Sequence, residues 1–294
     1  QMTTTASGGT PFNGGKMNHI FQPGRGHYEE GFASPAAQRC FEDPNSIATL
    51  KVHGECCLLV KQRPVMTRTT NDVVEGEPAE QQQQQEQDFE WIFCTRLDTK
   101  GKPFPPNHVP VPDDGTGVQQ QPAVFGKHTY CFVPLPPHYV VGKGEKTSRP
   151  GPDTYGAIRA GIAAGALPDP NDPTAPDFIT VEWIGKKHQG NMDCLEVDHA
   201  ITVHGSTIVD IPVRTRAAVE EMARTVSIEG VVFQDGETGE RFKLRFDMLD
   251  DNSLFAERSK QKVSTPDSTS IKPNVIVAAM DKTTTTTTTT ATTT

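Results

Sequence analysis

Hydrophobic and polar residues alternate in several short stretches of the chain, which is the pattern of β-strands with one buried and one exposed face. In residues 178–184 three apolar side chains would point to one side and Glu182 to the other. In residues 242–247 every second residue is apolar, and Lys243 and Arg245 fall between them. These two cations would therefore project from the same face of a strand.

Two further stretches have the same character. The apolar run 228–233 predicts a strand. Leu50 and Val52 flank Lys51 in another. Because side chains alternate along a strand, we expect Lys51 and His53 to share the face opposite Leu50 and Val52.

Apolar residues spaced by three and four positions predict a helix at 214–226, for which Thr215 is a suitable N-terminal cap. The apolar stripe consists of Val219, Met222, Ala223 and Val226. A shorter helix is expected at about 154–166. Short strands with few helices predict an α+β fold built on antiparallel sheets with helices outside.

The composition of the 294 residues indicates one domain flanked by two ends of biased composition. Residues 1–26 are rich in Gly, Thr and Asn, and residues 264–294 end in a threonine run, so both are expected to be disordered. The domain would occupy residues 27–263. Polar or Pro/Gly-rich stretches at 67–88 and 142–177 are interpreted as low-complexity insertions.

Charge and hydropathy limit the compartments and binding partners that we expect for the protein. The net charge is −9 and the mean hydropathy is −0.50, and no apolar run approaches the roughly 20 residues that span a bilayer. We expect a soluble monomer with no membrane partner in an intracellular compartment, cytoplasmic or nuclear. Any RNA contact must use local clusters of Lys and Arg. The six cysteines show no CxxC pairs, and the adjacent Cys56 and Cys57 would face opposite sides of a strand.

Five short motifs follow one another along these predicted strands. They are Lys51-Val52-His53-Gly54, Arg96-Leu97-Asp98, Glu182-Trp183-Ile184-Gly185, Glu229-Gly230-Val231-Val232 and Lys243-Leu244-Arg245. In this order they resemble the motifs of the covalent nucleotidyltransferases, the superfamily of DNA ligases, RNA ligases and mRNA capping enzymes. The first motif resembles that of phage RNA ligases of the second type. The stretches KVHGECC (51–57) and WIGKKHQGN (183–191) resemble the eukaryotic 5′-3′ RNA ligase 1 family.

The resemblance assigns the catalytic roles. It implies that Lys51 attacks the α-phosphorus of ATP, with His53 beside it in the motif, where the family usually has Asp. An amine attacks only when it is deprotonated, and neighbouring cations disfavour its charged form. Lys243 and Arg245 would have this effect and would also hold the α-phosphate.

The resemblance also assigns the binding roles. Glu229 would anchor Mg²⁺, or Mn²⁺ in its place. Glu182 would bind the ribose hydroxyls, Arg96 the nucleotide or the RNA end, and His204 would stack on adenine. Gly54 completes the nucleotide-binding motif around Lys51.

The implied fold is an antiparallel nucleotidyltransferase core of the ligase adenylation type, related to ATP-grasp, with outer helices. Only 49 residues follow Arg245, so a C-terminal OB barrel does not fit. The implied activity is that of an ATP-dependent RNA ligase in RNA repair. It would join a 5′-phosphate to a 3′-hydroxyl through a lysyl-AMP intermediate.

Two alternatives stay open. One is a capping guanylyltransferase that uses GTP. The other is a catalytically dead nucleotidyltransferase fold that binds RNA, for which the departures at His53 and Glu55 leave room.

Overall fold

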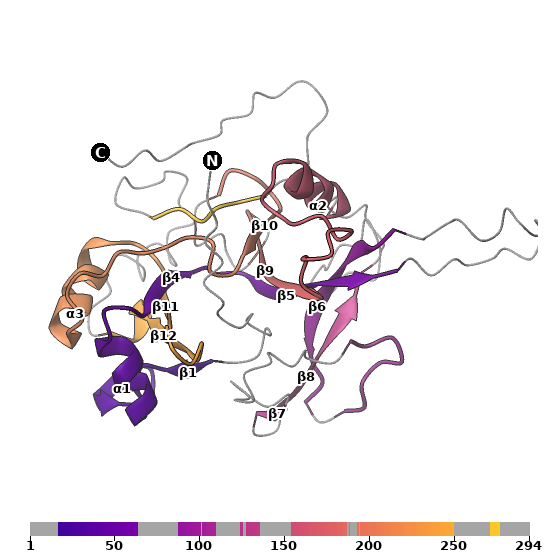
Figure 1. The fold of residues 1–294 in the computed structure, drawn as a ribbon. Coiled ribbons are helices and arrows are strands. Elements are labelled where there is room, and N and C mark those ends of the chain that lie inside the picture. Colours follow the sequence, from indigo (N-terminus) through magenta and orange to yellow (C-terminus); the bar gives the residue numbers. More distant parts are fainter. Residues whose placement is uncertain are drawn as a thin grey trace, which may run out of the picture.

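A computed structural model describes residues 17–63, 88–100, 102–109, 124–125, 128–135, 154–186, 188, 193, 195–249 and 271–276. Two larger sheets, each with a helix or helices outside it, and one small two-stranded sheet make up this part of the chain (Figure 1). Neighbouring strands are antiparallel with one exception, which confirms the predicted α+β class with mainly antiparallel sheets.

The first sheet has four strands in the order β1-β12-β11-β4. These are β1 (Asn18–His19), β4 (Ile47–Lys51), β11 (Gly230–Gln234) and β12 (Arg241–Arg245), and β1 runs parallel to β12. Its apolar face packs against α1 (Pro35–Glu42) and α3 (Arg216–Thr225). The small sheet of β2 (Phe21–Pro23) and β3 (Tyr28–Phe32) adds Phe21 and Tyr28 to this core.

The second sheet has six strands in the order β10-β9-β5-β6-β8-β7. Their bounds are β5 (Glu55–Gln62), β6 (Glu90–Asp98), β7 (Val124–Phe125), β8 (His128–Pro134), β9 (Phe178–Ile184) and β10 (Ala200–Val203). One face packs on α2 (Thr154–Ala163) through a core that includes Trp91, Phe93 and Trp183. The predicted strand at 178–184 is confirmed, with Val181 and Trp183 in this core.

The helices follow their local signals. In α3 the Thr215 hydroxyl accepts a hydrogen bond from the Ala218 amide at 3.3 Å, and Val219 and Ala223 are buried, as the spacing predicts. Helix α1 was missed because its eight residues are too few to show a period. Its signal was Ser34 before Pro35, and Ser34 accepts a hydrogen bond from the Ala37 amide at 3.1 Å.

Two strands have other bounds than predicted. Strand β12 ends at Arg245, and Asp247 lies in the short 3-10 helix Phe246–Met248 instead of the predicted strand. Strand β11 begins at Gly230, so Glu229 precedes it.

Three expectations of disorder or low complexity were wrong for the described residues. Residues 17–26 include β1 and β2, and Ile20 is fully buried. Residues 271–276 join the fold through Ile276, which exchanges both backbone hydrogen bonds with Ile201. The helix expected at about 154–166 is confirmed as α2, and the rest of residues 154–177, expected to be a low-complexity insertion, adds buried apolar side chains such as Leu167 and Ala175 to the second core. The insertion expected at 67–88 lies outside the described residues except for Asp88.

No helix in the described part of the chain is both long enough and apolar enough to cross a membrane.

Candidate functional site

Three of the predicted site residues lie on one face of the four-stranded sheet. Gly230 is opposite Lys51 on one side and opposite Arg245 on the other, and Lys243 stands in the next row. Because directly opposed residues project to the same side, Lys51, Lys243 and Arg245 share a face. Their apolar neighbours, such as Leu50 and Leu244, point into the core.

Gly230 permits this arrangement. A side chain here would place its Cβ 2.0 Å from the Leu244 carbonyl oxygen, and the residue has a φ of +154°. A glycine is therefore required for β11 and β12 to pair at this point. Since glycine has no side chain, only backbone separates Lys51 from Arg245 across the face.

Lys51 forms an ion pair with Glu229, so these two motifs meet in the structure. The side chains are shielded from solvent, with 20% and 8% of their surfaces exposed. Lys51 contacts one oxygen of Glu229. The second oxygen, Oε2, is buried, and no described residue gives it a hydrogen bond. A buried carboxylate oxygen without a partner is a suitable ligand for a hard divalent cation.

His19 brings the N-terminal segment to the same face. It lies opposite Lys243 in the β1–β12 pair, and its Nδ1 is 2.7 Å from the Tyr28 hydroxyl oxygen. The Arg245 amide donates to that oxygen at 3.0 Å, so the hydroxyl hydrogen is left to bond Nδ1. Burial, followed by the charges of Lys243, Arg245 and Lys51, lowers the pKa of His19 to about 4. His19 is therefore neutral at pH 7.

The second sheet contributes Glu182 from β9. Its Oε1 accepts a hydrogen bond from the Gly54 amide at 3.1 Å, and its Oε2 is 2.7 Å from His204 Nε2. Three predicted site residues are thus in contact, although they are up to 150 positions apart (204 − 54). His204, expected to stack on a base, has its ring held in place by the carboxylate of Glu182.

Gly54 lies in the connection that takes the chain from one sheet to the other. A Cβ at this position would approach the Trp183 carbonyl oxygen to 2.4 Å. The absence of a side chain lets the backbone amide reach Glu182. Strand β4 ends at Lys51, so the strand alternation expected to place His53 beside Lys51 does not extend to His53. Instead, the His53 amide donates to Asp193 Oδ2 at 3.3 Å.

Cys56 and Arg96 lie on the two strands that follow β9 in the sheet and continue the row of neighbouring positions across the strands that begins at Glu182. Cys56 on β5 is paired with Glu182, and Arg96 follows on β6, where its guanidinium carbon is 5.6 Å from the ring centre of Tyr130. Cys57 points into the core on the other face, so the prediction that the adjacent cysteines face opposite sides is confirmed. Burial raises the pKa of Cys56 to about 12, against the opposing effect of Arg96.

Asp193 was missed in the sequence analysis, because a single aspartate in a loop carries no local signal. Burial raises the pKa of its carboxyl to about 7, and the charges of Glu229 and Glu182 raise it further, against the effects of the His53 amide and Lys51. Asp193 is therefore under the electrostatic influence of both groups, Lys51 with Glu229 from the first sheet and Glu182 from the second. Residues 52–54 also join Lys51 of the first group directly to Gly54, whose amide bonds Glu182 of the second.

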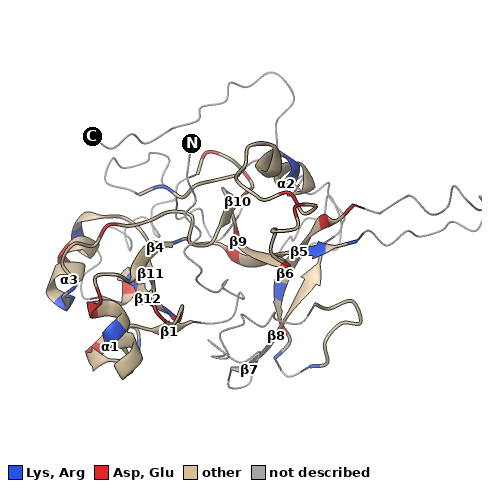
Figure 2. Ribbon diagram, in the orientation of Figure 1, with Lys and Arg blue, Asp and Glu red and all other residues tan. Residues whose placement is uncertain are grey.

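The arrangement suits a ligand that carries phosphate. Three cations share one face, and carboxylates stand at its edge. Elsewhere, acidic and basic residues are mixed over both sheets and the helices (Figure 2). Within this acidic protein of net charge −9, Lys51, Lys243 and Arg245 thus share one face, where Lys51 is paired with Glu229 and Arg245 with Asp247.

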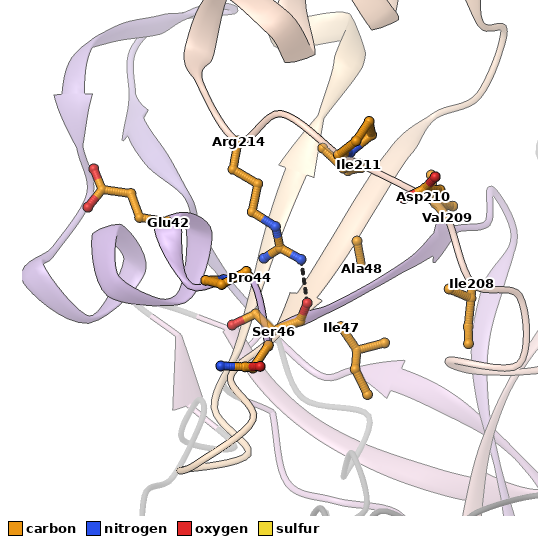
Figure 3. Close-up of a pocket in the computed structure, with 12 residues that line it drawn as sticks. Glu42, Pro44, Ser46, Ile47, Ala48, Ile208, Val209, Asp210, Ile211 and Arg214 are labelled. Carbon is orange, nitrogen blue, oxygen red and sulfur yellow. Dashed lines mark hydrogen bonds between the residues drawn. The ribbon is translucent and has the colours of Figure 1, made fainter.

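A separate hollow of about 850 Å³ lies at the other end of β4. Glu42 at the end of α1, residues 44–48 and residues 208–212 line it together with Arg214, which donates to the Ser46 carbonyl (Figure 3). None of the predicted site residues is among its lining residues.

No model of a known protein family matches the sequence, and no curated protein matches it. The function is therefore inferred from the site residues and their geometry.

Proposed function

We propose that the protein is an ATP-dependent RNA ligase that carries AMP on Lys51. The observation that carries the proposal is the position of Lys51: at the end of β4, paired with Glu229 and on one sheet face with Lys243 and Arg245. A nucleophilic lysine beside two cations and a carboxylate is the constellation that nucleotidyl transfer to an amine requires. The two sheets would then form a nucleotidyltransferase core.

The first step consumes ATP. Lys51 leaves its ion pair with Glu229 and loses a proton, and its Nζ then bonds to the α-phosphorus as the bond from that phosphorus to the bridging oxygen breaks. Pyrophosphate leaves with the electron pair, and the nitrogen releases a second proton. Lys243 and Arg245 stabilise the negative charge that develops on the α-phosphate oxygens.

Glu182 and His204 would hold the nucleoside. The Gly54 amide holds one oxygen of Glu182, and this fixes the carboxylate to accept hydrogen bonds from ribose hydroxyls. The ring of His204 lies beside it. Arg96 lies two strands from Glu182 in the same row and is suited to the phosphate of the nucleotide or the RNA end.

Glu229 fits the role of Mg²⁺ anchor, because its buried Oε2 has no hydrogen-bond partner among the described residues. A bound Mg²⁺ supplies positive charge to phosphate oxygens. In a completed cycle AMP passes to an RNA 5′-phosphate, and a 3′-hydroxyl then displaces it to join the strands.

The test is covalent labelling. The protein is incubated with α-labelled ATP and Mg²⁺, and we expect label that acid releases and alkali does not, as for a phosphorus–nitrogen bond. Lys51→Ala should abolish the label. Lys102→Ala is the matched control, because Lys102 is an exposed lysine that is not among the predicted site residues, and it should label like the wild type.

The alternatives give different results. Label from GTP in place of ATP indicates a guanylyltransferase. A folded protein that takes label from neither nucleotide overturns the proposal, and RNA binding by such a protein indicates a dead nucleotidyltransferase module.

A further inference from the structure

Cys56, Glu182 and His204 place a thiol, a carboxylate and an imidazole together. One ligand atom from each lies within 4.8 Å of the other two. They come from neighbouring elements of the six-stranded sheet (Figure 1): Cys56 from β5, Glu182 from its pairing partner β9, and His204 from the residue after β10. We propose that these three side chains bind one Zn²⁺ ion.

The types of ligand select the metal. Mg²⁺ takes oxygen ligands, whereas sulfur and imidazole nitrogen favour Zn²⁺ among the common ions. One thiolate and one carboxylate neutralise the two charges of the ion, and His204 contributes a neutral nitrogen. This site therefore differs from the Mg²⁺ anchor at Glu229 in position and in chemistry.

The geometry needs only a small adjustment. Zinc with nitrogen and oxygen ligands at about 2.0 to 2.1 Å in a tetrahedron separates those atoms by about 3.3 Å. His204 Nε2 and Glu182 Oε2 are now 2.7 Å apart, joined by a hydrogen bond. The ion would replace the bridging proton and push the two atoms slightly apart, while the Gly54 amide holds the other carboxylate oxygen in place at 3.1 Å.

Binding of zinc replaces the thiol proton of Cys56, which passes to solvent. Three protein ligands leave a fourth position for water or a phosphate oxygen.

Zinc at this position would hold Glu182 and His204, so it would compete with the nucleoside. This consequence rests on the proposed function, whereas zinc binding itself does not. Zinc occupancy would then govern whether the lysine can be loaded.

The experiment titrates Zn²⁺ into the reduced, full-length protein against a chromophoric chelator, and uses Co²⁺ as a spectroscopic probe. We expect one zinc per chain and a thiolate-to-cobalt charge-transfer band. Cys56→Ser and His204→Ala should each weaken binding at least tenfold, and Cys56→Ser should remove the band. Cys40→Ala is the matched control, because Cys40 is a buried free thiol in the other core and should leave both readouts unchanged.

Thermal melting of each variant verifies that it is folded. Stoichiometric zinc binding or a full cobalt band in folded Cys56→Ser overturns the proposal, as does the lack of zinc binding by the wild type. A separate measurement compares nucleotide labelling with and without zinc. Zinc binding without any labelling would refute the ligase and leave the metal site standing, and labelling without zinc binding would do the reverse.

Discussion

Asp193 offers a test of the site through stability, independent of any ligand. Its carboxyl accepts a hydrogen bond from the His53 amide, in the connection that joins β4 of the first sheet to β5 of the second. Burial is the largest cause that raises its pKa, from 3.8 to about 7. Asp193→Asn keeps the shape and an acceptor oxygen for the amide, and removes the ionisable group.

The direction in which stability changes with pH follows from the protons that the folded and unfolded states bind. Between the two pKa values the folded protein holds a proton on Asp193 that the unfolded chain has lost, so the folded state loses stability as the pH rises towards 7. Each pH unit costs up to about 1.4 kcal/mol, and because the folded state gives up its proton around pH 7, the total between about pH 5 and about pH 8.5 is about 2.7 kcal/mol. Asp193 is partly exposed as a residue, and solvent screening reduces this to about 1.5 kcal/mol.

Urea unfolding of the wild type and Asp193→Asn at about pH 5 and about pH 8.5 measures the effect. We expect Asn to gain about 1.5 kcal/mol over Asp on going from the lower to the higher pH. Asp210→Asn, at an exposed position, controls for general effects of charge and should show no such gain. An Asn–Asp difference that stays constant with pH, or an Asn variant that loses stability at high pH, would refute the reasoning, because Lys51 would then hold the carboxylate in its charged form.

Two further substitutions test the architecture around the site by chemical denaturation. Gly230→Ala should lower the free energy of unfolding by at least about 3 kcal/mol, because the new Cβ meets the Leu244 carbonyl oxygen. Gly205→Ala, at a positive φ with open space around it, should lower it by only about 1 kcal/mol. Equal losses would mean that β11 and β12 do not pair as described. Ile276→Ala should cost about 2 kcal/mol because Ile276 packs in the second core, and the neighbouring Val275→Ala, at an exposed side chain, should cost under 0.5 kcal/mol, roughly the value for surface positions. No loss from Ile276→Ala would contradict the docking of residues 271–276 on β10.

The local pattern of apolar residues was enough to predict the elements that show a clear strand or helix periodicity. The alternation in 178–184 predicted β9 and the side on which Glu182 lies, and the spacing in 214–226 predicted α3 and its cap at Thr215. In these segments the faces are set by a repeat of two or 3.6 residues, which a strand or helix has wherever it packs. The facing of Lys243 and Arg245 on β12 was predicted in the same way.

Only the tertiary structure decided which strands are neighbours. Lys51 and Glu229 meet across 178 positions because β4 pairs with β11. No local repeat encodes that pairing, which depends on both strands burying their other face in one core. The same holds for His19, which enters the site because β1 adds to the edge of β12, and for Asp193, which a loop carries to the His53 amide. Periodicity thus established which side Glu182, Lys243 and Arg245 face, and long-range packing established which charged residues share a site.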